Sequence, residues 1–366
     1  MHHYGVSGEA NVNFSLPIPG RVSNLFVSCD TPITSGSYTI ALRKNGANTT
    51  VSCVVGGGAT GCEDTTDTVD FAAADTLNLK VANSKAPQAP NCRATTTLTA
   101  TGGSAATDDV VTLQTDAESP ANGQFCGMNV AAGNMATTCD SASADDVSIV
   151  MPGTGTLTGL TARLNSNLGS GRSETFTVRN LTTGLDTGLV VTVSSATQVG
   201  STTTCTSNCT FTAGDRLAIR LNRTGGAVSK TRSLALSYTG AGSTLTSRRA
   251  HFGSGTNYGG YHLATDAATP GTAAVTMDRP ARLQNLYVNS TTVPTSPFTV
   301  TVCSGPTSPP SCSGVRPRCT VGSGSTGCND TSDAVTVAQG DYVEVQVQNQ
   351  GDTSGSVGFS VEVADP

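Results

Sequence analysis

The sequence contains no tryptophan, few other aromatic residues and few charged residues. Aromatic residues make up 4% of the 366 residues, and charged residues make up 13%, about half the usual share. Disordered chains carry more charge and fewer β-branched residues. The Ser, Thr, Gly, Val and Ala that dominate this chain instead indicate many short strands joined by tight turns.

Long runs of one residue type are also missing. The net charge is −6 and no basic run occurs, so we expect no nucleic-acid partner. No stretch of about 18 apolar residues is present, which predicts that the chain has no transmembrane helix. The segment from Met1 to Gly5 has no basic region followed by an apolar one, so we do not interpret it as a signal peptide.

The familiar catalytic and nucleotide-binding motifs are absent. The sequence has no phosphate-binding glycine fingerprint, no Gly-x-Ser-x-Gly elbow and no His-Glu-x-x-His pattern. The only histidines are His2, His3, His251 and His262, and an isolated histidine is more often structural or solvent-facing than catalytic. Sugar cleavage usually needs aromatic side chains that stack on the substrate. We therefore predict that the protein is not an enzyme and has no catalytic residue and no cofactor.

Acidic residues gather in short clusters between the expected strands. The clusters are Glu63-Asp64-Thr-Thr-Asp67, Asp108-Asp109, Asp145-Asp146 and Asp330-Thr-Ser-Asp333. Carboxylates clustered on loops can bind Ca²⁺, but no EF-hand or Gly-x-Asp repeat accompanies them. We interpret all four clusters as polar loop residues and predict no metal site.

Self-comparison shows three repeats with the same elements in the same order. The first element is an apolar residue, a turn that contains proline and a strand, at 16–27, 151–162 and 277–288. The second is an alternating strand with an aromatic residue, at 37–42, 175–178 and 297–302. In this alignment Tyr38, Phe176 and Phe298 are equivalent. Period-two alternation is typical of a half-buried strand.

The third element is a strand, an Ala/Gly-Asp turn and an alternating strand. It covers 69–81, 211–221 and 335–347. Asp75, Asp215 and Asp341 occupy the turn, where an aspartate side chain can accept a hydrogen bond from the nearby backbone. One more strand closes each repeat, at 95–100, 233–238 and 358–363.

The closing strands place three tandem domains at 1–101, 102–240 and 241–366. Regular strand spacing and the near absence of helical periodicity predict an all-β fold, with each domain a β-sandwich of jelly-roll-like topology. The first domain has the shortest lead-in, which predicts that it lacks an opening strand. An open sheet edge invites pairing with another chain, so we expect a neighbouring subunit to cover it.

The 12 cysteines support this alignment. Cys62 precedes Asp75 by the same number of residues as Cys328 precedes Asp341. Spacing predicts six disulfides, mostly local staples, and an oxidising location outside the cell or at a virion surface. The alternative, a zinc site, needs two closely spaced cysteine pairs, and only one pair comes near that spacing. The predicted disulfides are Cys29/Cys92, Cys53/Cys62, Cys126/Cys139, Cys205/Cys209, Cys303/Cys312 and Cys319/Cys328.

The repeated module is represented by Tyr38-Thr-Ile-Ala-Leu-Arg-Lys-Asn-Gly46, Asp64-Thr-Thr-Asp67 and Ala74-Asp75-Thr-Leu77. It resembles β-sandwich modules of phage virion proteins and bacterial extracellular structural proteins. The resemblance covers most of each repeat. It implies a structural role, and no catalytic residue is carried over from it.

Two functional hypotheses follow. The first is a non-enzymatic structural protein of a virion surface or an extracellular filament, such as a decoration, tail, fibre or filament subunit. Its partners would be copies of itself or other virion or filament proteins. The alternative is a secreted adhesin or matrix protein that binds glycans or a protein partner through its loops.

Overall fold

The computed structural model of the chain consists of β-strands, which confirms the predicted all-β class. Within the part of the chain that it describes, no helix is long and apolar enough to cross a membrane. It describes residues 2–3, 13–29, 31–84, 92–101, 108–114, 122–126, 139, 144, 147–240, 243–249, 256–259, 266–267, 274–348 and 357–366.

The strands form three sets, which we call the first, second and third repeats. In the first repeat, one antiparallel sheet has the order β1-β8-β3-β6 and the other has the order β2-β7-β4-β5. The bounds are β1 His2–His3, β2 Phe14–Ser15, β3 Gly20–Cys29, β4 Ser37–Lys44, β5 Ala47–Gly56, β6 Gly61–Phe71, β7 Thr76–Asn83 and β8 Cys92–Ala100.

The second repeat follows the same path. One sheet has the order β15-β12-β18-β9, with β16 also on β12, and the other has the order β10-β17-β13-β14, with β11 also on β17. The bounds are β9 Asp108–Gln114, β10 Gln124–Cys126, β11 Ile149–Val150, β12 Gly155–Leu164, β13 Ser173–Asn180, β14 Leu185–Ser194, β15 Val199–Thr202, β16 Thr210–Phe211, β17 Arg216–Thr224 and β18 Arg232–Thr239.

The third repeat has one sheet in the order β19-β28-β23-β26. Its other sheet has the order β21-β20-β27-β24-β25, with β22 also on β27. The bounds are β19 Ser243–Arg249, β20 Thr256–Gly259, β21 Asp266–Ala267, β22 Val275–Thr276, β23 Ala281–Ser290, β24 Phe298–Gly305, β25 Arg318–Val321, β26 Gly327–Val337, β27 Tyr342–Gln348 and β28 Val357–Ala364.

Alternating side chains place a hydrophobic cluster in each repeat. In β14, for example, Leu189, Val191 and Val193 are buried, whereas Val190 between them is exposed. Each of the three clusters draws residues from both sheets of its own repeat. The core therefore has three separate parts.

The predicted aspartate turn is the same in all three repeats. The residue before the aspartate is Ala74, Gly214 or Gly340. Its backbone amide donates a hydrogen bond of 2.8 Å to the carbonyl of Leu16, Met151 or Met277, respectively. This bond ties the turn to the start of the repeat. The aspartate side chain also accepts a backbone hydrogen bond, from Ala72 to Asp75 at 2.8 Å, Thr212 to Asp215 at 2.9 Å and Ala338 to Asp341 at 2.8 Å.

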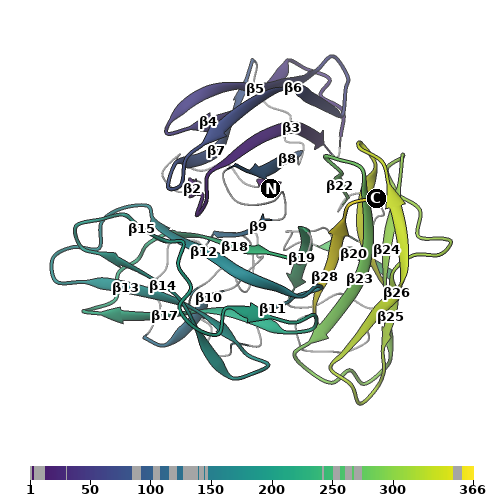
Figure 1. Ribbon diagram of the computed structural model, residues 1–366. Helices are drawn as coiled ribbons and strands as arrows, with labels where there is room; N and C mark the ends of the chain where they lie inside the picture. The colour runs from purple at the N-terminus through teal and green to yellow at the C-terminus, as the bar shows by residue number, and fades with distance from the viewer. Residues whose placement is uncertain are drawn as a thin grey trace.

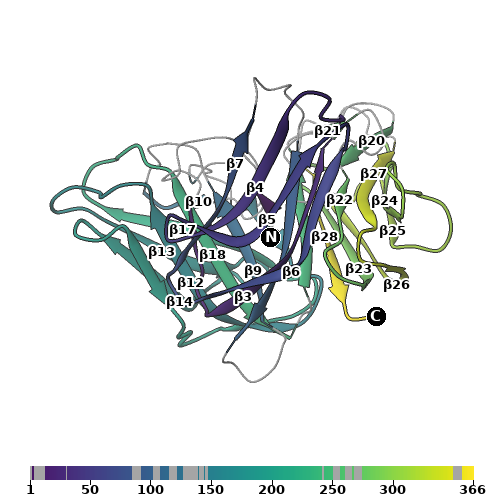
Figure 2. The same cartoon turned by 90° about the horizontal axis from the view of Figure 1, so that it is seen from above.

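The three repeats surround a common centre (Figure 1), and the sheets that contain β8, β18 and β28 face it. We call these the inner sheets. The short strand directly before the first long strand of the shared pattern (β2 before β3, β11 before β12, β22 before β23) is called the lead-in strand. At each junction the lead-in strand of one repeat lies against the inner sheet of another: β2 contacts β12 and β18, β11 contacts β23 and β28, and β22 contacts β3 and β8. The junctions therefore close a ring. Seen from above, the first repeat lies nearest the viewer (Figure 2).

The predicted absence of an opening strand in the first repeat is wrong. β1 pairs with β8, with His2 opposite Thr95 and His3 opposite Ala94. It has two residues, whereas β9 and β19 have seven each. A strand of two residues is too short to show alternating apolar and polar residues in a sequence. The segment before β3 therefore resembles a loop. The expected covering of the sheet edge by another subunit stays a prediction.

The alignment of the second element is also corrected. Leu77, Leu217 and Val343 each lie two residues after the turn aspartate and are therefore equivalent. Their partners on the neighbouring strand are Lys44, Asn180 and Ser304, so these three residues are equivalent too. The residue of the second repeat that corresponds to Tyr38 and Phe298 is therefore Glu174, not Phe176. Phe176 lies two residues further on, and a strand places such residues on the same face. Because Phe176 is aromatic, the sequence alignment places it opposite Tyr38 and Phe298, two residues out of register.

Candidate functional site

Three of the four acidic clusters lie differently from the prediction. Asp64 and Asp330 lie within the continuous strands β6 and β26, and Asp108-Asp109 opens β9. Asp145-Asp146 lies outside the described residues. The pairing of β3 with β6 jumps from Ser23–Thr68 to Leu25–Asp64, which marks a bulge. The polar residues between Asp64 and Thr68, which resemble a loop in the sequence, form this β-bulge.

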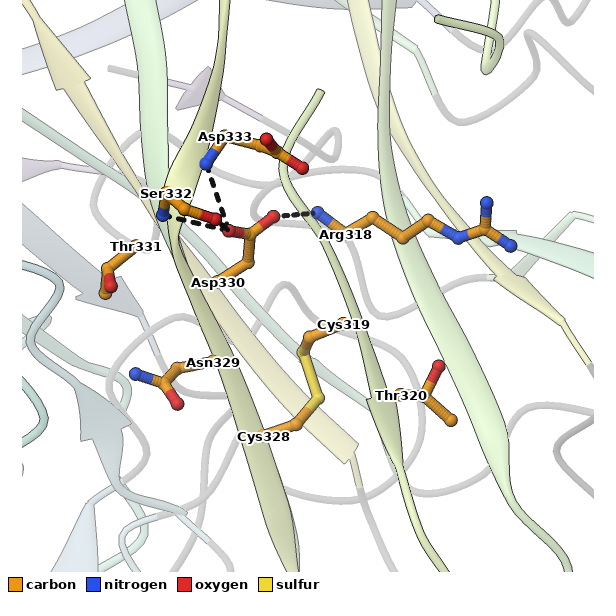
Figure 3. Close-up of a pocket in the computed structure, with 9 residues that line it drawn as sticks. All are labelled: Arg318, Cys319, Thr320, Cys328, Asn329, Asp330, Thr331, Ser332 and Asp333. Carbon is orange, nitrogen blue, oxygen red and sulfur yellow. Dashed lines mark hydrogen bonds between the residues drawn. A yellow bond between two sulfur atoms is a disulfide. The ribbon is translucent and has the colours of Figure 1, made fainter. Parts of the chain in front are cut away.

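The carboxylate of Asp330 organises the bulge in the third repeat. It accepts backbone hydrogen bonds from Arg318 at 2.8 Å, Ser332 at 3.0 Å and Asp333 at 3.1 Å (Figure 3). The Ser332 hydroxyl adds a fourth at 2.9 Å. Partial burial disfavours the charged form, but these donors outweigh burial and hold the pKa of Asp330 below its usual range.

We call this aspartate, with its three backbone donors and one hydroxyl donor, a carboxylate clasp. The first repeat contains the same clasp around Asp64. Asp64 accepts backbone hydrogen bonds from Ser52 at 2.9 Å, Thr66 at 3.1 Å and Asp67 at 3.0 Å, and another from the Thr66 hydroxyl. Burial again opposes ionisation, and the donors again lower the pKa of the carboxyl. Because the carboxylate is already satisfied by the chain's own donors, its arrangement is that of a structural group.

The opposite strand contains a second signal that the sequence interpretation missed. Asn24 and Asn285 lie at the matching bulge positions with left-handed φ values of 53° and 52°. Asparagine adopts this conformation more readily than most residues. Two asparagines at the same position of two repeats, between alternating apolar residues, could have marked the bulge in the sequence.

A shallow polar concavity of about 450 Å³ lies beside the Asp330 clasp. The disulfide Cys319–Cys328 crosses it between β25 and β26, and Arg318 extends its side chain away from Asp330 (Figure 3). Arg318, Thr320 and Asn329 are exposed. The corresponding residues in the first repeat are Ser52, Val54 and Glu63, so the first repeat lacks this set of polar groups.

Individual contacts can be named at two of the junctions between repeats. Between the first and second repeats, a Cβ at Gly159 would lie 3.1 Å from the Cβ of Pro17, so the chains approach closely. At the junction of the third and first repeats, the Thr97 hydroxyl donates 2.7 Å to the carboxylate of Asp278, and the Thr95 hydroxyl donates 3.1 Å to the carbonyl of Thr276. This last junction therefore includes polar contacts.

The six disulfides join the pairs that the cysteine spacing predicts. They are Cys29–Cys92, Cys53–Cys62, Cys126–Cys139, Cys205–Cys209, Cys303–Cys312 and Cys319–Cys328. Among the described residues no cysteine is free. Six disulfides indicate folding in an oxidising, extracellular environment.

Two of the four histidines lie among the described residues. His2 and His3 form β1, and His251 and His262 lie outside the described residues. Within those residues, no group of three or more His, Cys, Asp or Glu side chains is arranged to hold a metal ion. No known family model and no curated protein sequence matches the chain. Function is therefore inferred from the geometry of the clasps, the concavity and the ring.

Proposed function

We propose that the protein is a non-enzymatic structural subunit of a virion surface or an extracellular filament. In this proposal the chain folds as three jelly-roll β-sandwich domains, at 1–101, 102–240 and 241–366. The strand order supports this topology. A jelly roll divides eight strands between two sheets, and the first repeat has two four-stranded sheets, β1-β8-β3-β6 and β2-β7-β4-β5.

The observation that carries the functional proposal is the closed ring of junctions. Each repeat uses the same two surfaces, a lead-in strand and an inner sheet, to contact its neighbours. Such repeated contacts organise a shape around an axis, which is what a fibre, tail or decoration subunit requires. The polar groups of the acidic clasps are used to hold bulges, and the disulfides staple the sheets. All these features serve rigidity.

The test is the native mass of the purified, non-reduced protein by light scattering, followed by electron microscopy of the particles. A trimer or a polymer is the expected result. A monodisperse species of 36.9 kDa across the accessible concentration range would contradict the proposal.

The polar concavity beside Asp330 supports a second candidate, an adhesin that binds glycans. Exposed Arg318, Thr320 and Asn329 provide donors and acceptors of the kind that sugar hydroxyls use. The test is glycan-array binding by the wild type and by Asn329→Ala. Binding that Asn329→Ala abolishes would favour this candidate. Asp67→Ala, at the matching clasp of the first repeat, is the control.

A further inference from the structure

All three junctions of the ring are head-to-tail contacts. Each joins a lead-in strand to an inner sheet, so the two contacting surfaces are different. A contact of this kind closes into a ring only when the rotation between units returns to the start. When it does not, the same contact continues from molecule to molecule as an open chain.

One junction differs from the other two in its connection. The first repeat is followed directly by the second between β8 and β9, and the second by the third between β18 and β19. The third and first repeats are not consecutive in the chain. Only non-covalent contacts join them, and we call their junction, formed by β22 and Asp278 against β3 and β8, the seam.

The seam is held by a relay of polar groups. Asn24 donates 3.2 Å to the hydroxyl of Thr97, which in turn donates 2.7 Å to Asp278. In the first and second repeats a proline, Pro17 or Pro152, follows the residue that corresponds to Met277, where the third repeat has Asp278. Groups that separate at a polar junction regain hydrogen bonds with water, so separation is less unfavourable than at an apolar junction of equal size.

We propose that the seam also forms between molecules, with the third repeat of one copy docked on the first repeat of the next. The partner is a second copy of this chain, and each new contact repeats the intramolecular one. This proposal rests on the proposed structural function and specifies the surfaces that join the subunits. One surface is β22 with Asp278, and the other is β3 and β8 with Thr95 and Thr97.

The experiment mixes two variants that each carry one added cysteine, Thr97→Cys and Asp278→Cys, in equal amounts under mild oxidation. Neither variant can form the seam disulfide within one chain, so a disulfide that joins position 97 to position 278 links two chains. Peptide mapping separates this disulfide from the 97–97 and 278–278 disulfides that random collisions produce. The mixture is concentrated, oxidised and analysed by non-reducing electrophoresis and intact mass. Each variant is first checked for six native disulfides and for a wild-type circular dichroism spectrum.

The matched control mixes Thr175→Cys with Thr192→Cys, whose hydroxyls lie 2.9 Å apart on an exposed face within the second repeat. A two-chain species several-fold more abundant than in this control supports the proposal. An amount equal to the control overturns it. If the single variants do not fold, the double variant Thr97→Cys/Asp278→Cys replaces them: a ladder of covalent multimers supports the proposal, and cross-linked monomer alone overturns it.

The native mass of the wild-type protein in solution distinguishes the seam proposal from the proposed structural function. Multimers of the wild type without seam cross-links would contradict the seam contact and leave the structural function standing. A wild type that is monomeric at every concentration would contradict both.

Discussion

Arg232 and Glu174 form a fully buried, two-pronged ion pair in the core of the second repeat. The guanidinium of Arg232 donates hydrogen bonds of 2.9 Å and 2.6 Å to the two carboxylate oxygens of Glu174. The side chain of Arg232 is 0% exposed and that of Glu174 is 2% exposed. The third repeat has Phe298 and Val357 at the corresponding positions. A position in the core that is apolar in one repeat is thus charged in another.

Glu174→Gln should strongly destabilise the protein, because it leaves the Arg232 charge buried without a counter-charge. The expected loss is about 3 kcal/mol or more in the free energy of unfolding. Urea unfolding followed by circular dichroism measures it. Arg21→Ala is the control, because Arg21 forms its ion pair with Asp70 in solvent, where both side chains are more than half exposed, and it should change stability little.

The double variant Glu174→Phe/Arg232→Val should be close to the wild type in stability or more stable, because both charges are removed together. This pair reproduces the residues of the third repeat. A double variant as unstable as Glu174→Gln would mean that shape, and not charge, controls this part of the core.

Gly340→Ala should destabilise the third repeat through its backbone alone. Gly340 has a φ of 87°, and a Cβ there would meet nothing within 4 Å. The left-handed conformation disfavours alanine by about 1–2 kcal/mol. The control is Gly322→Ala, which has equal open space and no such φ. Ala74, at the same turn with a φ of 68°, should gain stability on replacement by glycine. Thermal unfolding of the three variants tests these expectations.

The disulfides should contribute unequally to stability. Cys29–Cys92 spans 63 residues and Cys205–Cys209 spans 4. The chain-entropy relation gives about 4 kcal/mol for the long loop and about 2 kcal/mol for the short one. Replacing each pair by alanine and measuring the urea midpoint tests the order. Equal losses for the two pairs would contradict the entropic account.

Acid should weaken the two carboxylate clasps. The pKa values of Asp64 and Asp330 are lower in the folded state than the ordinary value of 3.8. Their stabilisation is therefore fully present above the unfolded pKa and is lost as pH falls through the folded pKa. Asp64→Asn should reduce stability at neutral pH and flatten this acid dependence, as measured by urea unfolding across pH.

The control for the clasp is Asp67→Asn. Asp67 contributes its backbone amide to the Asp64 clasp, and that amide is kept in the variant. An acid dependence of Asp64→Asn identical to that of Asp67→Asn would show that the clasp carboxylate does not govern acid stability.

Local patterns in the sequence predict the turns and the strands well. At the Ala/Gly-Asp turns, Asp75, Asp215 and Asp341 each accept a hydrogen bond from a backbone amide three residues earlier, so the local sequence contains this part of their cause. The bulges at Asp64 and Asp330 were misinterpreted because the carboxylate takes its donors partly from another strand, at Ser52 and Arg318. No pattern within β6 or β26 shows that partner.

The ring was not predicted at all. Its junctions join residues far apart in the chain, such as Thr97 and Asp278, and threonine and aspartate are common loop residues anywhere in this sequence. The ion pair was hidden for a related reason. Glu174 and Arg232 lie on different sheets of the second repeat, and the nearby Phe176 resembles the aromatic residue of the other repeats.

Linking the three repeats in one chain changes how their arrangement responds to dilution. Three separate subunits must meet again after each dissociation, so their assembly weakens as concentration falls. Repeats joined by short connections remain at a high effective concentration near one another. A particle released into a large volume of water would therefore keep this trefoil of β-sheets when a trimer of independent chains would fall apart.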